Sequence, residues 1–263
     1  QLIKDVLNLT NDWISLSQLN KQIQEHGGSS QEILRYSLLW MVKYNLLNLK
    51  SPTGGEIGAY DLSPWAGKET KNLPTDFRQV VTDIAEFTNE SVESVFSKCA
   101  QFTDLTKEEW LRINPETWEQ KRDFYRTTRS YIYELAEWHR RAPKIKEMVL
   151  DLVEGICLDF GCGIATLSLL GKQYGKTIFA YDIESFTFEF AKFRLRKHHA
   201  SHLISEVPQS HTYDTIVCVD VLEHLEVPLQ ILKDLNTLLK PDGKLIISAL
   251  GGGTTETHPM HTE

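Results

Sequence analysis

The chain has 263 residues, of which 41% are apolar, so it is long enough for two domains and can build a sizeable core. Its 36 acidic residues outnumber its 28 basic residues, and the net charge of −8 argues against a broad electrostatic grip on nucleic acid or on an anionic membrane. No apolar run reaches the roughly 20 residues that a membrane-spanning helix needs. The four cysteines form no CxxC pair and no secretory framework, so we expect a cytoplasmic protein.

Residues 1–66 are predicted to form a small helical unit with a hairpin, similar to a winged helix. The segment 29–32, Ser-Ser-Gln-Glu, has the form of a capping box, and apolar residues at helical spacing follow it. Segments 47–49 and 59–62 are predicted as two strands, with a turn rich in proline and glycine between them. Acidic residues slightly outnumber basic ones here, so we expect pairing of two subunits or covering of a substrate site rather than DNA binding.

Residues 67–150 are predicted to be a mostly helical linker and lid. Thr106, with Glu109 three positions later, indicates a helix start. The stretch 119–139 is amphipathic and rich in aromatic residues, which predicts a helix. Two interpretations of it stay open. It can pack on the following domain with a basic face in solvent, or its tyrosines, among them Tyr125 and Tyr131, can close over a bound molecule.

From residue 151 to residue 263 the pattern alternates between strand and helix. Apolar runs at 156–158, 179–181, 215–219 and 245–249 are typical of buried strands, and helical segments separate them. This alternation predicts an α/β domain with a doubly wound, mostly parallel sheet that is covered on both faces.

A glycine turn follows the first of these strands. Residues 158–165 read Leu-Asp-Phe-Gly-Cys-Gly-Ile-Ala, in which Gly161 and Gly163 permit a tight turn and close approach of a ligand to the backbone. The helix that follows would direct its free N–H groups at the same crevice. Asp182 ends the next strand, about 20 residues later, where a carboxylate can accept hydrogen bonds from both hydroxyls of a ribose. Dinucleotide-binding domains share these features.

Two further motifs separate the alternatives. Residues 213–225 read Tyr-Asp-Thr-Ile-Val-Cys-Val-Asp-Val-Leu-Glu-His-Leu, and residues 239–245 read Leu-Lys-Pro-Asp-Gly-Lys-Leu. Together with the glycine turn and Asp182, in this order, they resemble the motifs of class I S-adenosylmethionine-dependent methyltransferases over roughly residues 120–250. The resemblance implies S-adenosylmethionine as cofactor and methyl transfer to a hydroxyl or an acidic carbon of a small or carrier-tethered substrate.

The resemblance also implies roles for single residues. Asp159 would act near the amino group of the cofactor, the glycine turn would hold its methionine end, and Asp182 would hold its ribose. The implied cofactor-binding residues are Asp159, Gly161, Cys162, Gly163, Asp182, Ile183, Asp220, Val221 and Leu222. His224 would orient the substrate or act as a base beside Glu223. For the adenine contact, the short segment 201–209 offers only Glu206.

A metal site is a second hypothesis for the same segment. Some relatives, the small-RNA 2′-O-methyltransferases and the ubiquinone-pathway O-methyltransferases, bind a metal through a comparable Glu-His segment. Here Glu223 and His224, with His258 and His261, could hold magnesium, manganese, iron or zinc. Such a metal could lower the pKa of a substrate hydroxyl. The alternative is that the segment serves without metal, as is common in the superfamily. A histidine-rich stretch that begins at His198 reads as solvated surface.

The ends of the sequence favour a longer natural protein. The usual fold continues beyond the fifth strand, so we expect the C-terminal strands to be missing, and Gln1 is not a natural start. A non-enzymatic alternative also stays open: a winged-helix regulatory or binding protein with a cofactor-sensing domain that does not catalyse. A third hypothesis is a pseudo-enzyme that stabilises a partner protein, which the intact glycine turn and Asp182 disfavour.

Overall fold

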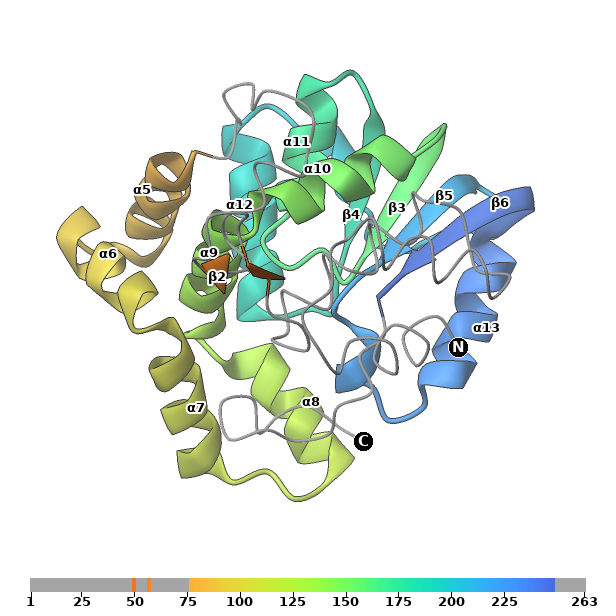
Figure 1. The fold of residues 1–263 in the computed structure, drawn as a ribbon. Helices are drawn as coiled ribbons and strands as arrows, with labels where there is room; N and C mark the ends of the chain where they lie inside the picture. Colours follow the sequence, from red (N-terminus) through yellow and green to blue (C-terminus); the bar gives the residue numbers. More distant parts are fainter. Residues whose placement is uncertain (1–48, 51–55, 58–75, 249–263) are drawn as a thin grey trace. The chain divides into compact units, whose positions relative to one another are not determined.

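The computed structural model describes residues 49–50, 56–57 and 76–248 of the chain (Figure 1). The chain divides into two compact units, residues 1–69 and 70–263. In the first unit, strands β1 (Leu49–Lys50) and β2 (Glu56–Ile57) pair in antiparallel fashion. A hairpin therefore lies where one is predicted, although β2 precedes the predicted second strand at 59–62. That segment and the capping box at 29–32 lie outside the described residues.

The described part of the second unit begins with a series of helices. They are α5 (Phe77–Thr88), α6 (Val92–Ala100), α7 (Phe102–Ile113), α8 (Trp118–Thr127), α9 (Tyr131–Arg141) and α10 (Pro143–Leu152). The predicted helix start at Thr106 is wrong. Thr106 lies inside α7, where its buried hydroxyl donates to the carbonyl of Phe102 one turn earlier. The helix starts at Phe102, whose buried ring makes an edge contact with Trp138, so packing rather than capping chemistry decides the boundary.

The predicted single helix over 119–139 is two helices in the structure. A carboxylate from α7 explains the break between α8 and α9. Glu109 Oε2 accepts hydrogen bonds from Thr128 Oγ1 at 2.7 Å and from Ser130 Oγ at 2.6 Å. Thr128 has non-helical backbone, with φ −56° and ψ 134°, and these bonds fix the chain at this break. Thr117 and Gln120 form a capping box that starts α8.

A parallel sheet forms the centre of the second unit. Its described strands are ordered β4-β3-β5-β6, and every neighbouring pair is parallel. Helices connect them, as expected for a doubly wound sheet, and the predicted fold class is confirmed. The elements are β3 (Ile156–Phe160), α11 (Thr166–Gln173), β4 (Thr177–Tyr181), α12 (Phe186–Lys197), the short helix η1 (Ser201–Leu203), β5 (Tyr213–Cys218), the short helix η2 (Leu222–His224), α13 (Pro228–Leu238) and β6 (Leu239–Ile247).

Alternate residues of the strands enter two different cores because side chains along a strand point to opposite faces. On one face, Cys157 and Val217 pack with residues of α10 and α11. On the other, Leu158 and Ile216 pack with Leu235 of α13. The helices thus cover both faces of the sheet, and α13 lies beside β5 and β6 (Figure 1). None of the described helices combines the length and apolar character needed to cross a bilayer.

Two sequence motifs take forms that the pattern did not predict. Residues 239–245, predicted as a turn before the last strand, belong to β6. Pairing with β5 jumps there from Tyr213 opposite Leu239 to Thr215 opposite Lys244, so the turn is absorbed as an irregularity within the strand. In segment 201–209, considered above for an adenine contact, the described residues pair with β4 through an isolated bridge between Ala180 and Ile204.

Candidate active site

A cavity of about 470 Å³ opens at the carboxyl ends of β3, β4 and β5. In open α/β sheets this end of the strands is where ligands bind. Its volume is in the range of small-molecule sites. It is lined by Trp118, Arg122, Tyr125, Tyr131, Leu135, His139, Lys146, Phe160, Gly161, Cys162, Gly163, Tyr181, Asp182, Ile183, Ser185, Thr187, Val219, Asp220, Val221, His224, Leu225, Glu226, Val227 and Ile231.

The glycine turn forms the floor of this cavity. Gly161 has φ +77°, and a Cβ atom there would come within 2.3 Å of Val221 Cγ2. Gly163 has φ +54°, and its Cβ would meet Leu135 Cδ1 at 2.9 Å. Gly161 therefore needs glycine for backbone conformation and for space, whereas Gly163 needs it mainly for the left-handed backbone, because the Leu135 methyl group can move. The N–H groups of Gly161 and Cys162 donate to the Tyr181 carbonyl at 2.8 and 3.1 Å, which ties the turn to the end of β4.

Asp182 closes the cavity on the side of β4. Its two carboxylate oxygens accept hydrogen bonds from the backbone N–H groups of Gly163 and Ile183, each at 2.8 Å. Burial raises the pKa of Asp182 to about 7, although both N–H donors favour the charged form. The acid that ends the second strand and the glycine turn thus lie together, as the sequence predicts, and Ile183 lines the cavity beside them.

Asp159 lies behind the cavity rather than among its lining residues. It shares a strand face with Cys157, toward α10, whereas the neighbouring Phe160 reaches the cavity. Its Oδ2 atom is buried and has no hydrogen-bond partner among the described residues. Burial raises the pKa of Asp159 to about 6, and the positive charge of Lys146 partly opposes this. Buried carboxylate oxygens normally accept a hydrogen bond, so this atom is an unsatisfied acceptor within the described part of the chain.

The loop after β5 supplies the opposite wall. Asp220 and Val221 line the cavity, whereas the predicted cofactor residue Leu222 is buried and does not. Asp220 has φ +59°, and Ser248 at the end of β6 fixes it: the Ser248 hydroxyl donates to Asp220 Oδ1 at 3.0 Å and accepts from the Asp220 N–H at 2.8 Å. The ends of β5 and β6 therefore position this carboxylate together.

His224 lines the cavity and contacts a tyrosine from α8. The Tyr125 hydroxyl and His224 Nδ1 are 2.8 Å apart, and the two rings lie 5.2 Å apart between centroids. Burial raises the pKa of Tyr125 well above its usual value, so the phenol is neutral at physiological pH. Tyr125 and Tyr131 both line the cavity, as the lid interpretation of segment 119–139 requires, while the Tyr125–His224 contact also packs α8 on the following domain, so both interpretations stay open. Glu223 is buried and does not line the cavity.

Of the α8 residues that line the cavity, Tyr125 belongs to the lid interpretation of the sequence, whereas Trp118 and Arg122 were not predicted as site residues. Trp118, Arg122 and Tyr125 recur at helical spacing, and all three line the cavity. Behind them, Phe124 packs edge-to-face on Trp110 with centroids 4.9 Å apart. The sequence does contain two signals for this helix face: the capping box at Thr117 and the helical spacing of the three residues. The capping box is overlooked when a single longer helix is assumed.

The predicted metal ligands are not brought together in the part of the chain that the structure describes. His258 and His261 lie outside it, and the described residues contain no group of three or more His, Cys, Asp or Glu side chains suited to a metal. The metal site stays a prediction. Glu206, the candidate for an adenine contact, is exposed and is not among the residues that line the cavity.

Comparison with known families places these features in context. The family model described as "Methyltransferase domain" matches residues 125–258, just over half of the chain. The ubiquinone biosynthesis O-methyltransferase of Haemophilus ducreyi is 31% identical over 104 residues, which are 35% of this chain and 44% of that protein. The mitochondrial ubiquinone biosynthesis O-methyltransferase of Schizosaccharomyces pombe is 34% identical over 103 residues, 35% of this chain and 37% of that protein. The chain thus spans less than half of the length of these curated relatives.

Solved structures give similar neighbours. A mitomycin 7-O-methyltransferase matches with a TM-score of 0.40 and 14% identity, covering 97% of this chain and 77% of that chain. An O-methyltransferase family protein from Burkholderia thailandensis matches with a TM-score of 0.42 and 14% identity, covering 94% and 73%.

Proposed function

Because the chain belongs to the methyltransferase domain family, we propose that it is an S-adenosylmethionine-dependent methyltransferase that methylates a hydroxyl group of a small or carrier-tethered molecule. The observation that carries this proposal is that one cavity is lined by two sets of residues with different chemistry. The first set is the glycine turn with Asp182, and the second is the hydrogen-bonded pair of Tyr125 and His224. A methyl donor and a methyl acceptor must meet within one such cavity, shielded from water.

The first set of residues, the glycine turn with Asp182, fits the proposed cofactor. The turn from Gly161 to Gly163 presents backbone without side chains, which allows close approach of the methionine part. Asp182 offers two carboxylate oxygens to the ribose hydroxyls. Asp159 lies behind the lining residues, so its negative charge would act on the ammonium group of the methionine part through space rather than by direct contact. When bound, S-adenosylmethionine supplies a methyl group on a positively charged sulfur.

In the second set, we assign His224 to the removal of the proton from the acceptor hydroxyl. Neutral imidazole carries its proton on one nitrogen and is basic at the other. In the tautomer that carries the proton on Nδ1, the ring donates to the Tyr125 oxygen, and Nε2 is the basic nitrogen. Tyr125 then holds the ring in place, and its raised pKa keeps it from competing as an acid.

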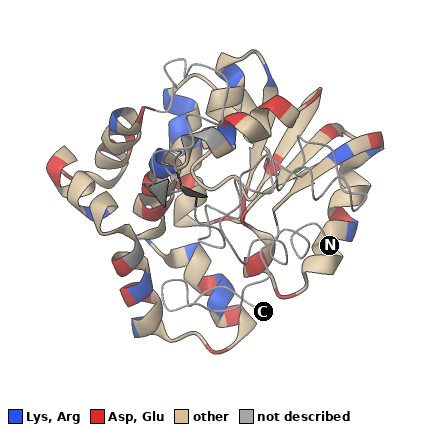
Figure 2. Ribbon diagram, viewed as in Figure 1, with Lys and Arg blue, Asp and Glu red and all other residues tan. Residues whose placement is uncertain are grey.

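Relatives named as O-methyltransferases support a hydroxyl as the acceptor. The cavity lining also includes the apolar residues Leu225, Val227 and Ile231, together with Trp118, which favour an acceptor with a large apolar surface. Arg122 and Glu226 add charged groups of both signs to the lining, and residues of both charges recur along α8 (Figure 2).

Calorimetric titration of the purified protein with S-adenosylhomocysteine tests the cofactor assignment, and titration with a nicotinamide dinucleotide is its control. We expect binding of the first compound alone. Methyl transfer from labelled S-adenosylmethionine to a panel of phenols, aliphatic alcohols and carrier-bound acids then tests the acceptor. Binding of the dinucleotide instead would overturn the assignment. Cofactor binding without transfer to any hydroxyl, but with transfer to carbon, would overturn the acceptor class alone.

A further inference from the structure

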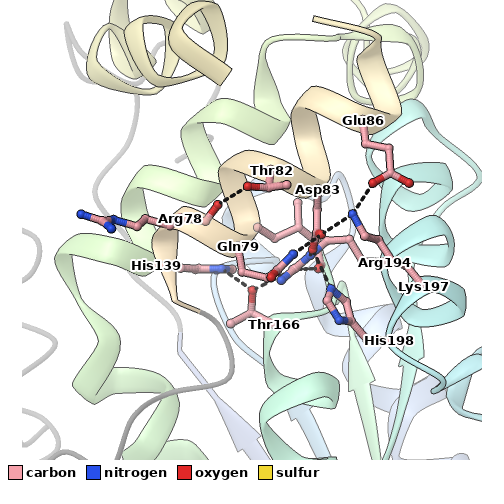
Figure 3. Close-up of polar contacts among 11 residues, drawn as sticks. Arg78, Gln79, Thr82, Asp83, Glu86, His139, Thr166, Arg194, Lys197 and His198 are labelled. Atoms are coloured by element: carbon pink, nitrogen blue, oxygen red, sulfur yellow. Dashed lines mark hydrogen bonds and ion pairs between the residues drawn. The ribbon is translucent and has the colours of Figure 1, made fainter. Parts of the chain in front are cut away.

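A buried ion pair links α5 to α12, outside the chemistry proposed above (Figure 3). Asp83 is 0% exposed and Arg194 is 1% exposed, and Arg194 Nε donates to Asp83 Oδ2 at 3.2 Å. Ion pairs buried to this degree are weak contributors to stability, because desolvation of both charges offsets their attraction. α5 also precedes residue 125, where the match to the family begins. Both facts call for an explanation of why the pair is there.

Asp83 is held by more donors than Arg194 alone. Gln79 Nε2 donates to it at 2.9 Å, His198 Nε2 lies 2.8 Å away and Lys197 Nζ lies 3.1 Å away. Burial by itself would raise the pKa of Asp83, but these partners hold it below its usual value, so the carboxylate is charged. His198 is therefore not the solvated surface residue that the sequence suggests. With this set of partners, Asp83 fixes one side of the Arg194 guanidinium.

The other side of Arg194 contacts the glycine turn. Its Nη1 atom donates to the carbonyl oxygen of Ile164 at 2.5 Å and lies 3.5 Å from Thr166 Oγ1. Ile164 is fully buried and stands between Gly163 and Ala165, which both have left-handed backbone with φ +54° and +56°. A buried carbonyl requires a donor. Ala165 also begins α11 without any side-chain cap, so the guanidinium holds a strained stretch of backbone in place.

This network extends to the wall of the cavity. Thr166 Oγ1 and His139 Nδ1 are 2.8 Å apart, and His139 lines the cavity, as Gly163 does. Gly163 in turn donates to Asp182. A continuous set of contacts therefore leads from the carboxylate on α5 to the groups that we assign to the cofactor.

We infer that Arg194, held by Asp83, is a positioning residue that keeps the glycine turn in its cofactor-binding conformation, so that α5 is a structural part of the cofactor site. The inference rests on the proposed function. Arginine suits this task because its planar fork serves the carboxylate and the Ile164 carbonyl at once, whereas a lysine ammonium on a single stem acts as one point charge.

The test compares Arg194→Lys with Phe87→Leu. The Phe87 ring packs α5 on α12, against Phe186, Phe190 and Phe193, but has no described contact with Asp83, Arg194 or the glycine turn. Arg194→Met and Asp83→Asn extend the series if both fold. For each variant, calorimetry gives the dissociation constant of S-adenosylhomocysteine, thermal unfolding gives Tm, and hydrogen exchange without ligand reports on the amides of Gly163 and Ala165. These two amides are hydrogen-bonded in the intact turn.

We expect Arg194→Lys to weaken S-adenosylhomocysteine binding at least tenfold and to speed exchange at Gly163 and Ala165. Phe87→Leu should change the affinity by less than twofold, even if its Tm falls as much. Wild-type affinity in Arg194→Lys, or equal weakening in Phe87→Leu, would overturn the inference, since the second result would trace the effect to general packing of α5. Absence of binding to the wild-type protein would instead refute the proposed function, while the exchange data would still report on the turn.

Discussion

Replacement of Gly161 by alanine tests how closely the glycine turn approaches the loop after β5. The added Cβ would lie 2.3 Å from Val221 Cγ2, whereas carbon atoms in contact are normally about 3.5–4.0 Å apart. Val221 must therefore move by about 1 Å or more, and Val221 lines the cavity. The left-handed backbone adds a cost of roughly 1–2 kcal/mol for any residue with a side chain.

Gly175 offers a matched control for this variant. It has φ +69°, but a Cβ there would have no atom within 4 Å. Gly175→Ala therefore carries the backbone cost without the steric one. Both variants should lower Tm by a few degrees, at ~2–4 °C per kcal/mol for a domain of this size. Only Gly161→Ala should also weaken S-adenosylhomocysteine binding by at least tenfold, or about 1.4 kcal/mol, in calorimetric titration.

A second substitution makes the steric argument refutable. Val221→Ala removes the Cγ2 and Cγ1 atoms and leaves the Val221 Cβ position 3.4 Å from the new methyl group. The double variant Gly161→Ala/Val221→Ala should therefore recover most of the affinity lost by Gly161→Ala, relative to Val221→Ala alone. The reasoning fails if Gly161→Ala and Gly175→Ala bind the ligand equally well, or if the double variant shows no recovery.

The remaining predictions concern the titratable groups of the site. His224→Ala should slow methyl transfer by roughly 10²-fold or more while the affinity for S-adenosylhomocysteine stays within about twofold, and Tyr125→Phe should slow transfer less. Single-turnover rates and calorimetry measure both effects. An unchanged rate in His224→Ala would show that His224 is not the base. Because the pKa of Asp182 is raised to about 7, affinity for S-adenosylhomocysteine should increase from pH 6 to pH 8 as the carboxylate ionises, and Asp182→Asn should abolish this dependence in calorimetry. The same shift means that, above about pH 4, the folded protein keeps a proton on Asp182 that the unfolded chain has lost. The free energy of unfolding should therefore fall as the pH rises from about 4 to 7. Denaturation of the wild type and of Asp182→Asn over this range measures the effect. Asp159→Asn should raise Tm at pH 8 without ligand, since it removes a buried charge, but weaken S-adenosylhomocysteine binding; a lower Tm would show that the carboxylate is better solvated than its buried Oδ2 indicates.

The parallel sheet could be predicted because short, local patterns of apolar and turn-forming residues indicate buried strands and the turns after them. The run 156–158 lies within β3, and the run 215–219 lies within β5 apart from its last residue, Val219. Boundaries set by distant partners could not be predicted. The break between α8 and α9 depends on the carboxylate of Glu109, about twenty residues away, and no local signal at Thr128 reveals it.

The candidate site divides in the same way. The glycine turn and Asp182 were predicted, because a tight turn and a strand-ending acid have recognisable short patterns. Asp159 was placed at the cavity on the strength of the motif, whereas strand alternation turns it toward α10. The Asp83–Arg194 pair joins residues 111 positions apart, and a single acid and a single base at such a distance give no pattern to read.

The arrangement of α8 has a consequence for how such an enzyme could diversify. Its three cavity-lining residues stand on one outer helix, fixed by its own cap and by the packing of Phe124 on Trp110. The glycine turn instead belongs to the central strands. Under the proposed function, changes along α8 would alter which alcohol is accepted while the donor is gripped as before. Selection, or a designer with a library limited to Trp118 and Arg122, could therefore explore new acceptors without rebuilding the catalytic scaffold.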